Sequence, residues 1–295
     1  MANARKGWLW AAAGAGLGLA AWLGHQRQQR ASATLRDALL GHDAGASAPA
    51  ARVRFDQLDA LPGPVQRYFR HVLADGQPLI ASAQVEQAGS LRTTLDTPRW
   101  MPFTATHLVR PAAPGFLWNA RVQAAPLVHL RVLDAYADGH GASRLFAMSA
   151  LQVAAARPGP ELDAGALHRY LAEGAWYPTA LLPSEHLAWT PIDEHRAMAT
   201  ITDHDTTVSL EFRFNAIGEI TGVYTPGRWG NFGGGYQLRG WEGRVSDYVE
   251  QDGMRVPSRA EVGWYDDALQ WQRVWQGQVT GLRYEMLPGA PGSEQ

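Results

Sequence analysis

From residue 79 onward, apolar and polar side chains alternate along the chain with a period of two, as in β-strands that bury one face. The clearest run is TVSLEFRF, in which Val208, Leu210, Phe212 and Phe214 share one face. Similar apolar and aromatic runs occupy residues 79–95, 103–110, 115–122, 127–136, 143–154, 196–202, 219–225, 238–250, 254–265 and 269–286. Short connections between consecutive strands require antiparallel pairing, so the pattern predicts one long meandering antiparallel sheet.

Turn residues separate the predicted strands. Asp138-Gly139, Asp203–Asp205, Ile217-Gly218 and Asp252-Gly253 are the kinds of residues that hairpin turns favour. Residues 227–240 are rich in glycine, but they lack the lysine and serine or threonine of a phosphate-binding loop. We expect a flexible loop or a strand bend there.

Helical spacing appears in two places. Val65, Phe69 and Val72 recur behind Pro64, and this segment should form a short amphipathic helix that docks on the sheet. A second helix is expected over about 161–173, ended by Gly174. One long antiparallel sheet with a few helices predicts the α+β fold class. A sheet of about ten strands has to curl or split. We expect a large curved antiparallel sheet, a half-barrel, with a few covering helices and an N-terminal transmembrane helix.

Residues 7–24 carry no charge and would span about 27 Å as a helix. A bilayer core is about 30 Å thick, and the length favours an uncleaved membrane anchor, with a signal peptide as the alternative. We expect a single-pass anchor in an inner or plasma membrane, with the folded domain on the extracytoplasmic side. Basic residues on the two sides of the stretch nearly balance, so orientation is only weakly specified.

The predicted organisation has four parts. Residues 1–25 form the anchor or signal segment, residues 26–57 a linker, residues 58–287 a single β-rich domain, and residues 288–295 a disordered tail. The linker prediction rests on residues 41–52, which are small, polar and contain proline.

Composition excludes several classes of function. The chain has 295 residues, a net charge of −2 and no cysteine. The absence of cysteine excludes disulfides, thiolate metal sites and a thiol nucleophile. The near-neutral charge gives no sign of nucleic-acid binding, and no cofactor motif appears. The expected partners are the membrane and a lipid-like ligand.

The stretch AEGAWYPTALLPS, residues 172–184, follows the second predicted helix. Pro178 and Pro183 prevent the helix from resuming, which predicts a rigid, extended connector. Trp176, Tyr177, Leu181 and Leu182 would expose a large apolar patch if this connector lay in water. We therefore expect it to act as a lid or plug over a pocket.

Charged residues near this segment and on the last strands are further candidates. Glu173 ends the helix, where the dipole disfavours a carboxylate, and it should need an arginine partner. Asp247 shares a strand face with Val245 and is expected to face the same pocket. The arginines predicted to pair with these acids are Arg239, Arg244 and Arg273.

The final predicted strand combines bulky apolar residues with a cation. Trp271, Arg273 and Trp275 alternate onto one face, where the guanidinium would stack on the rings. If this face points inward, it lines a cavity suited to an amphiphile with an acidic head. A packed core with a structural arginine is the alternative.

Motifs for catalysis and metal binding are weak. Ser184 and His186 lie two residues apart without the glycine elbow of a serine hydrolase. The acidic and histidine clusters at 193–195 and 203–205 flank one strand and would be about 25 Å apart. We expect no metal site and no catalytic residue.

Several blocks resemble one bacterial family. ALPGPVQRYFRHVL, WMPFTATH, GFLWNAR, LAEGAWYPTALLPS and WEGRVSDYVEQDGMRVPSRAEVGW together resemble DUF6544/DUF6920, a group of uncharacterised proteins, over residues 58–285. The last strands also look like the LolA class of lipoprotein carriers, which implies a curved sheet closed by helices around an apolar cavity.

Three functions remain open from the sequence. The first is a membrane-tethered domain that binds a hydrophobic ligand. The second is a hydrolase that uses Glu173 or Asp247. The third is a structural or partner-binding envelope protein.

Overall fold

The computed structural model describes residues 22–39, 52–95 and 97–288. Its strands are β1 Ile80–Leu91, β2 Met101–Arg110, β3 Gly115–Ala125, β4 Val128–Ala137, β5 His140–Ala147, β6 Leu151–Ala155, β7 Leu187–Pro191, β8 Arg196–Asp203, β9 Thr206–Phe214, β10 Ile220–Asn231, β11 Tyr236–Gln251, β12 Met254–Tyr265 and β13 Trp271–Met286. The helices are α2 Gly63–Val72 and α3 Pro160–Ala172, and the 3₁₀ turns are η2 Phe55–Leu58, η3 Glu173–Trp176 and η4 Pro178–Leu181. A further helix covers residues 22–39.

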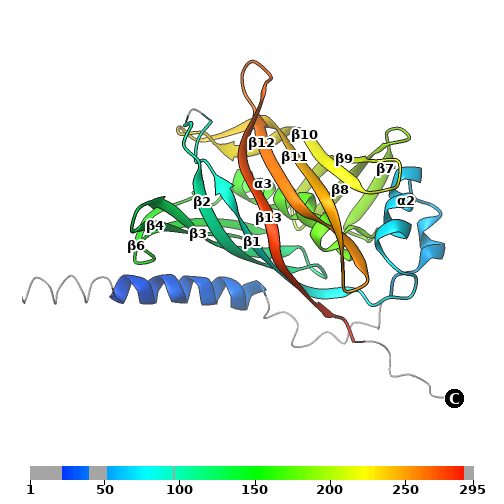
Figure 1. Ribbon diagram of the computed structural model, residues 1–295, viewed down its shortest axis with the longest axis horizontal. Helices are drawn as coiled ribbons and strands as arrows, with labels where there is room; N and C mark the ends of the chain where they lie inside the picture. The colour runs from blue at the N-terminus through cyan, green and yellow to red at the C-terminus, as the bar shows by residue number, and fades with distance from the viewer. Residues whose placement is uncertain (1–21, 40–51, 96, 289–295) are drawn as a thin grey trace, which may run out of the picture.

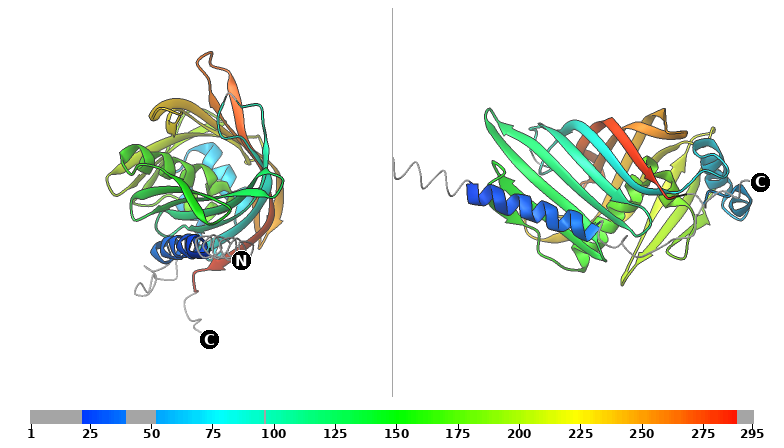
Figure 2. Two further views of the ribbon diagram at one scale, coloured as in Figure 1. Left: turned by 90° about the vertical axis from the view of Figure 1, so that its left-hand side faces the viewer. Right: turned by 90° about the horizontal axis from the view of Figure 1, so that it is seen from below.

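One antiparallel sheet of 13 strands forms the body of the molecule. Strands β1–β6 run outward from the centre to one edge, and strands β7–β13 run inward from the other edge. Because β13 pairs with β1, these two arms become one continuous sheet. The sheet curls around α3 (Figures 1 and 2). The predicted curved antiparallel half-barrel with covering helices is confirmed.

Alternation places the core on the concave face. Val208, Leu210, Phe212 and Phe214 of β9 are all buried, as the period of two predicts. Helix α3 lies on this face and contacts β4, β5, β9 and β10. The chain therefore crosses from one arm to the other through α3.

Both predicted helices form. Helix α2 buries Val65, Phe69 and Val72 and caps one end of the sheet, where Tyr68 packs against Phe214 with ring centroids 5.9 Å apart. The predicted turns also form: Asp138 and Gly139 have φ values of 52° and 80°, the left-handed conformation that this hairpin turn requires.

The N-terminal region differs from the expected linker, because residues 26–39 are helical, within a helix described over residues 22–39. Leu35 and Leu39 pack against Leu108 and Leu117. Leu117 alternates with the inward-facing Trp118, so this helix lies on the convex face, below β3 and β4 in Figure 1. Helical spacing of leucines explains the difference, since the linker prediction rested on residues 41–52.

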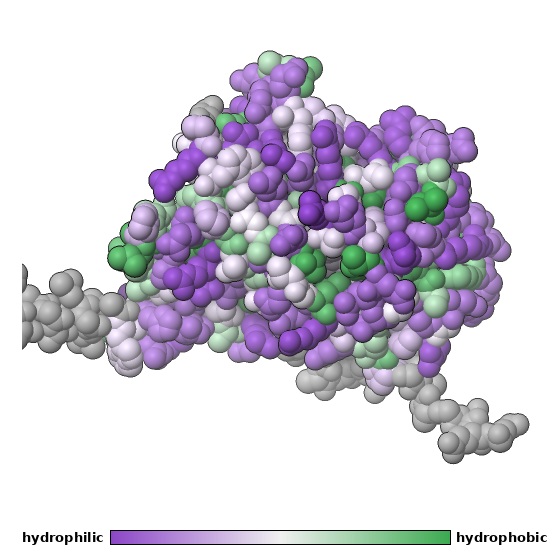
Figure 3. Space-filling model, viewed as in Figure 1, coloured by the Kyte–Doolittle hydropathy of each residue, from purple (hydrophilic) through white to green (hydrophobic). Residues whose placement is uncertain are grey.

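The predicted membrane-spanning stretch, residues 7–24, falls largely outside the described residues. Within residues 22–39, 52–95 and 97–288, no helix combines the length and the apolar character needed to cross a membrane. The visible surface of Figure 3 is mostly hydrophilic, with an apolar area near β4 and β6.

Two local predictions need correction. The segment after α3 is not an extended connector, because it coils into the 3₁₀ turns η3 and η4, with Pro178 in the first turn of η4. Residues 227–240 are not mainly a loop, because β10 and β11 extend to a tight hairpin at 232–235. The run 143–154 divides into β5 and β6, and β7 was not predicted.

Candidate functional site

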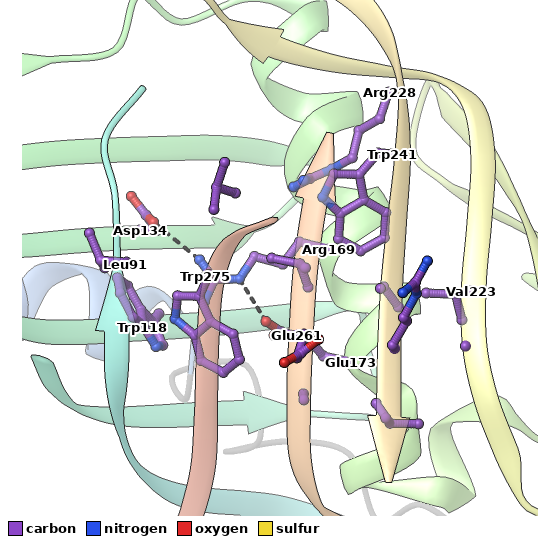
Figure 4. A pocket seen from close by; sticks show the side chains of 18 of the residues that line it. Leu91, Trp118, Asp134, Arg169, Glu173, Val223, Arg228, Trp241, Glu261 and Trp275 are labelled. Atoms are coloured by element: carbon purple, nitrogen blue, oxygen red, sulfur yellow. Dashed lines mark hydrogen bonds and ion pairs between the residues drawn. The ribbon is translucent and has the colours of Figure 1, made fainter. Parts of the chain in front are cut away.

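The concave face of the sheet holds a partly enclosed cavity of about 440 Å³. Its walls come from both arms, with α3 and η3 closing it from the concave side (Figure 4). The apolar lining consists of Leu91, Trp118, Val132, Ala172, Ala175, Trp176, Ile220, Val223, Trp241, Val245, Ala260, Val262, Val274 and Trp275. A cavity of this size is within the range that binds small ligands.

The 3₁₀ segment is firmly built into the core. Trp176 Nε1 donates to the Pro257 carbonyl at 3.0 Å, and the hydroxyl of Tyr284 donates to the Trp176 carbonyl at 2.6 Å. Tyr177 is fully buried and donates its hydroxyl to the Tyr170 carbonyl at 2.6 Å. The segment therefore packs against the concave face of the sheet, as a plug would. Its residues Glu173, Ala175 and Trp176 contribute to the cavity wall.

Arg169 of α3 is the centre of a buried ion cluster. Its Nε donates to Glu173 Oε1 at 2.9 Å and its Nη1 donates to Asp134 Oδ2 at 3.1 Å. The guanidinium also stacks over Phe116 and Trp118, at 5.1 and 4.8 Å from their ring centroids. Burial opposes the positive charge, but the two carboxylates outweigh burial and raise the pKa of Arg169.

His107 lies behind this cluster. It is completely buried, its Nε2 is 3.4 Å from Glu173 Oε2, and it stacks on Phe116. Burial lowers the pKa of His107 to about 4, because its effect exceeds the opposing effect of the Glu173 carboxylate. The ring is therefore neutral at pH 7. His107 does not line the cavity.

Arg228 of β10 is a second, half-buried cation, and it faces the cavity. Its guanidinium stacks over Trp241 and Trp264, at 4.7 and 5.2 Å, and its Nε and Nη2 both donate to the Gly165 carbonyl of α3. A register shift between Thr225 and Arg228 adds one residue to β10 and turns Arg228 onto the concave face. Burial lowers the pKa of Arg228 to about 10, so it stays charged at pH 7.

Of the residues predicted as site residues, four line the cavity: Glu173, Trp176, Arg244 and Trp275. Tyr177 and Leu181 are buried in the core beside it, and Leu182 lies in a separate hollow with Leu79 and Pro183. Glu173 has the expected arginine partner, but the partner is Arg169, one helical turn away, and not Arg239, Arg244 or Arg273.

Trp271 and Arg273 do not line the cavity, although Trp275 does. The register of β12 against β13 shifts between Val262 and Gly263, so Trp275 and Arg273 do not continue one alternating face. Arg273 pairs with Glu261 and stacks on Trp100. The guanidinium of Arg244 stacks over Trp271, 3.9 Å from the ring centroid.

Asp247 also lies elsewhere. It has a φ of 57°, which interrupts the alternation of β11, and its half-exposed carboxylate is paired with Arg259 Nε at 3.0 Å. Asp247 therefore does not line the cavity.

The carboxylate of Glu173 lines the cavity and is tied to α3. Its Oε1 accepts from Arg169 Nε at 2.9 Å. Among the described residues, no group of three or more histidine and acidic side chains is arranged to hold a metal.

Sequence reasoning missed Asp134, Arg169, Arg228 and Trp241. Arg169 and Glu173 are four residues apart on one helix, and this spacing is the signal that would have paired them. Asp134 and Arg228 come from strands of opposite arms, and no local pattern brings them together.

Comparisons with known proteins give a family but no activity. The family model of DUF6544, a family of unknown function, matches residues 51–276. No curated protein sequence matches the chain. A LolA superfamily protein from Nitrosomonas europaea aligns with a TM-score of 0.42 and 11% identity, over 78% of this chain and 96% of that one. A β-barrel-like protein of domain of unknown function DUF1849 from Brucella abortus aligns with a TM-score of 0.29 and 8% identity, over 70% and 99% of the two chains.

Proposed function

Since this chain belongs to the DUF6544 family of unknown function, its role has to be inferred from its own cavity, and we propose that it binds a lipid-like or other hydrophobic ligand there. The cavity is the observation that carries this proposal. Protein interiors pack like organic crystals and leave few voids larger than a water molecule. A partly enclosed, mostly apolar space of about 440 Å³ between the sheet, α3 and η3 supports a ligand site.

The chemistry of the lining supports an apolar ligand. Tryptophans from three different strands, Trp118, Trp241 and Trp275, contribute large apolar surfaces (Figure 4). Polar groups are few and most are already satisfied by each other, as in the ion cluster around Arg169. Such a site gains most of its affinity from apolar contact and takes its orientation from a few fixed charges.

Membrane attachment is part of this proposal. Residues 7–24 would tether the domain to a bilayer on the extracytoplasmic side, close to a source of hydrophobic ligands. The uncharged stretch and its terminal tryptophans support this. Flotation of the full chain with lipid vesicles tests it, and a chain that stays at the bottom of the gradient would contradict it.

A cavity-filling variant tests ligand binding. Val223→Phe adds a ring to the cavity wall and should weaken binding of the uncharged dye N-phenyl-1-naphthylamine by about tenfold or more. Val249→Phe is the matched control, because Val249 is exposed on β11 and away from the cavity. Native mass spectrometry of the wild-type chain should also detect a co-purified lipid.

Two results would contradict the proposal. One is a wild-type chain that binds neither the dye nor any co-purified molecule. The other is dye binding that Val223→Phe and Val249→Phe affect equally, which would place the dye outside the cavity.

A further inference from the structure

Arg228 is a half-buried cation whose contacts are incomplete. A guanidinium has five N–H donors. Arg228 uses Nε and Nη2 on a single backbone carbonyl, that of Gly165, at 3.3 and 3.0 Å. Within the described part of the chain, no carboxylate lies within ion-pair distance of it. Its Nη1 makes no hydrogen bond to the described residues, so this donor is available to a partner from outside the protein.

The comparison with Arg169 makes this difference clear. Both arginines are half-buried, both guanidiniums stack on two aromatic rings, and both line the same cavity. Arg169 contacts two carboxylates, those of Asp134 and Glu173. The carboxylates influence Arg228 only from beyond contact distance, as does the like charge of Arg169. Arg228 therefore differs from Arg169 in facing the cavity without a carboxylate at contact distance.

We propose that Arg228 binds the anionic head group of the ligand, which makes the preferred ligand an acidic single-chain amphiphile. This inference rests on the proposed function. A planar carboxylate or a phosphate accepts two parallel N–H bonds from a guanidinium, and the aromatic rings of Trp241 and Trp264 hold that guanidinium in place. The acyl chain would then lie against the apolar wall.

Competition between an acid and an alcohol of the same chain length tests the head-group preference. Palmitate and hexadecanol should both displace N-phenyl-1-naphthylamine from the wild-type chain, and palmitate should bind about tenfold to a hundredfold more tightly. Arg228→Gln should abolish this preference while binding of hexadecanol persists. Arg228→Lys, which keeps the charge without the planar fork, should keep a reduced preference. Hexadecyl phosphate then distinguishes a phosphate head from a carboxylate.

The control is Arg239→Gln. Arg239 lies opposite Arg228 in the β10–β11 register, but it pairs with Asp267 and does not line the cavity. Equal affinity of the wild-type chain for palmitate and hexadecanol would overturn the role of Arg228 and leave hydrophobic binding intact. Binding of neither would overturn the proposed function itself.

A second inference concerns one end of the sheet. Leu127 at the β3–β4 turn, and Met148 and Leu151 at the β5–β6 turn, are exposed, at 91%, 50% and 67% of their surface. The turns are adjacent, because the Met148 N–H donates to the His129 carbonyl at 2.9 Å. All five residues of the edge strand β6 are exposed, Val153 among them.

The first described turn of the helix of residues 22–39 lies at this same end. A Cβ on Gly24 would lie 2.2 Å from the Ala150 carbonyl oxygen, so the helix backbone touches the β5–β6 turn. Trp22 and Leu23, in the first described turn of this helix, are exposed at 55% and 45% of their surface. Arg121 of β3 and Arg131 of β4 lie nearby, opposite each other in the strand register. Neither arginine has an ion-pair partner among the described residues.

We infer that this end, consisting of Trp22, Leu23, Leu127, Met148, Leu151 and Val153, docks on the surface of a lipid bilayer. The uncharged run of residues 7–24 leads directly into it. Apolar side chains flanked by arginines are the composition that inserts at an interface rich in anionic lipid. The docking would fix how the cavity is oriented relative to the membrane.

The chain has no cysteine, so single labels can be introduced without background. The full chain carrying Leu127→Cys or Leu151→Cys, labelled with a polarity-sensitive dye, should show quenching by brominated lipids in vesicles of phosphatidylcholine and phosphatidylglycerol. Leu269→Cys is the control, because Leu269 is 78% exposed at the tip of the β12–β13 hairpin, away from this end (Figure 1). The inference would be overturned if the labels at all three sites reported an aqueous environment. It would also be overturned if the labels at Leu127→Cys and Leu151→Cys reported an apolar environment that brominated lipid does not quench, a result that favours a protein partner.

Discussion

At the scale of single residues, His107 should make stability depend on pH. Burial lowers its pKa to about 4, against an unfolded value of about 6.5. The unfolded chain takes up the proton first as the pH falls, so stability present above about pH 6.5 is lost progressively toward pH 4. The loss should be on the order of 3 kcal/mol. His107→Phe keeps the stack on Phe116 and should remove the His107 contribution to this loss. Urea unfolding measured between about pH 6.5 and pH 4 checks it.

His168 sets the control for this experiment. It is buried on α3, and burial and the nearby Arg228 lower its pKa to about 4, so the variant should keep part of the pH dependence. His186→Phe, which changes an exposed histidine, is the substitution control. A slope that is the same in His107→Phe and the wild type would contradict the assignment.

The residues of the site were only partly predictable. Trp176 and Glu173 could be placed because proline and helix-end chemistry act locally. Arg228 could not, because a one-residue shift in β10 decides which way it points. Its partner Gly165 is 63 positions away in sequence, and pairing at that distance leaves no local signal.

At the scale of elements, the period of two predicted most strands and their faces, because burial on one side dictates the alternation. Where the alternation is interrupted, the prediction was wrong about faces. Asp247 has a positive φ, and Trp271 and Arg273 lie beyond a register shift, so all three leave the face that counting assigns to them. Strand β7 was missed because only Leu187 and Trp189 mark its buried face.

At the scale of the whole molecule, two hairpin tips bring the arms of the sheet together. The Tyr136 hydroxyl of β4 donates to Asp203 Oδ2 of β8 at 2.8 Å, and both residues are buried. Gly139 lies so close to His204 that a Cβ there would be 2.8 Å from the ring. These strands come from opposite arms, so the contact closes the open side of the half-barrel beside α3.

Tyr136→Phe should therefore weaken this closure. The buried Asp203 would lose its hydroxyl partner, which should lower the free energy of unfolding by about 1–3 kcal/mol. Because the arms enclose the cavity between them, the variant should also release N-phenyl-1-naphthylamine faster in stopped-flow displacement. Tyr236→Phe is the matched control, since that hydroxyl donates to the Arg157 carbonyl at an exposed position. If the two variants unfold and release the dye alike, the Tyr136–Asp203 contact does not hold the arms together, and the β1–β13 pairing and α3 join them without it.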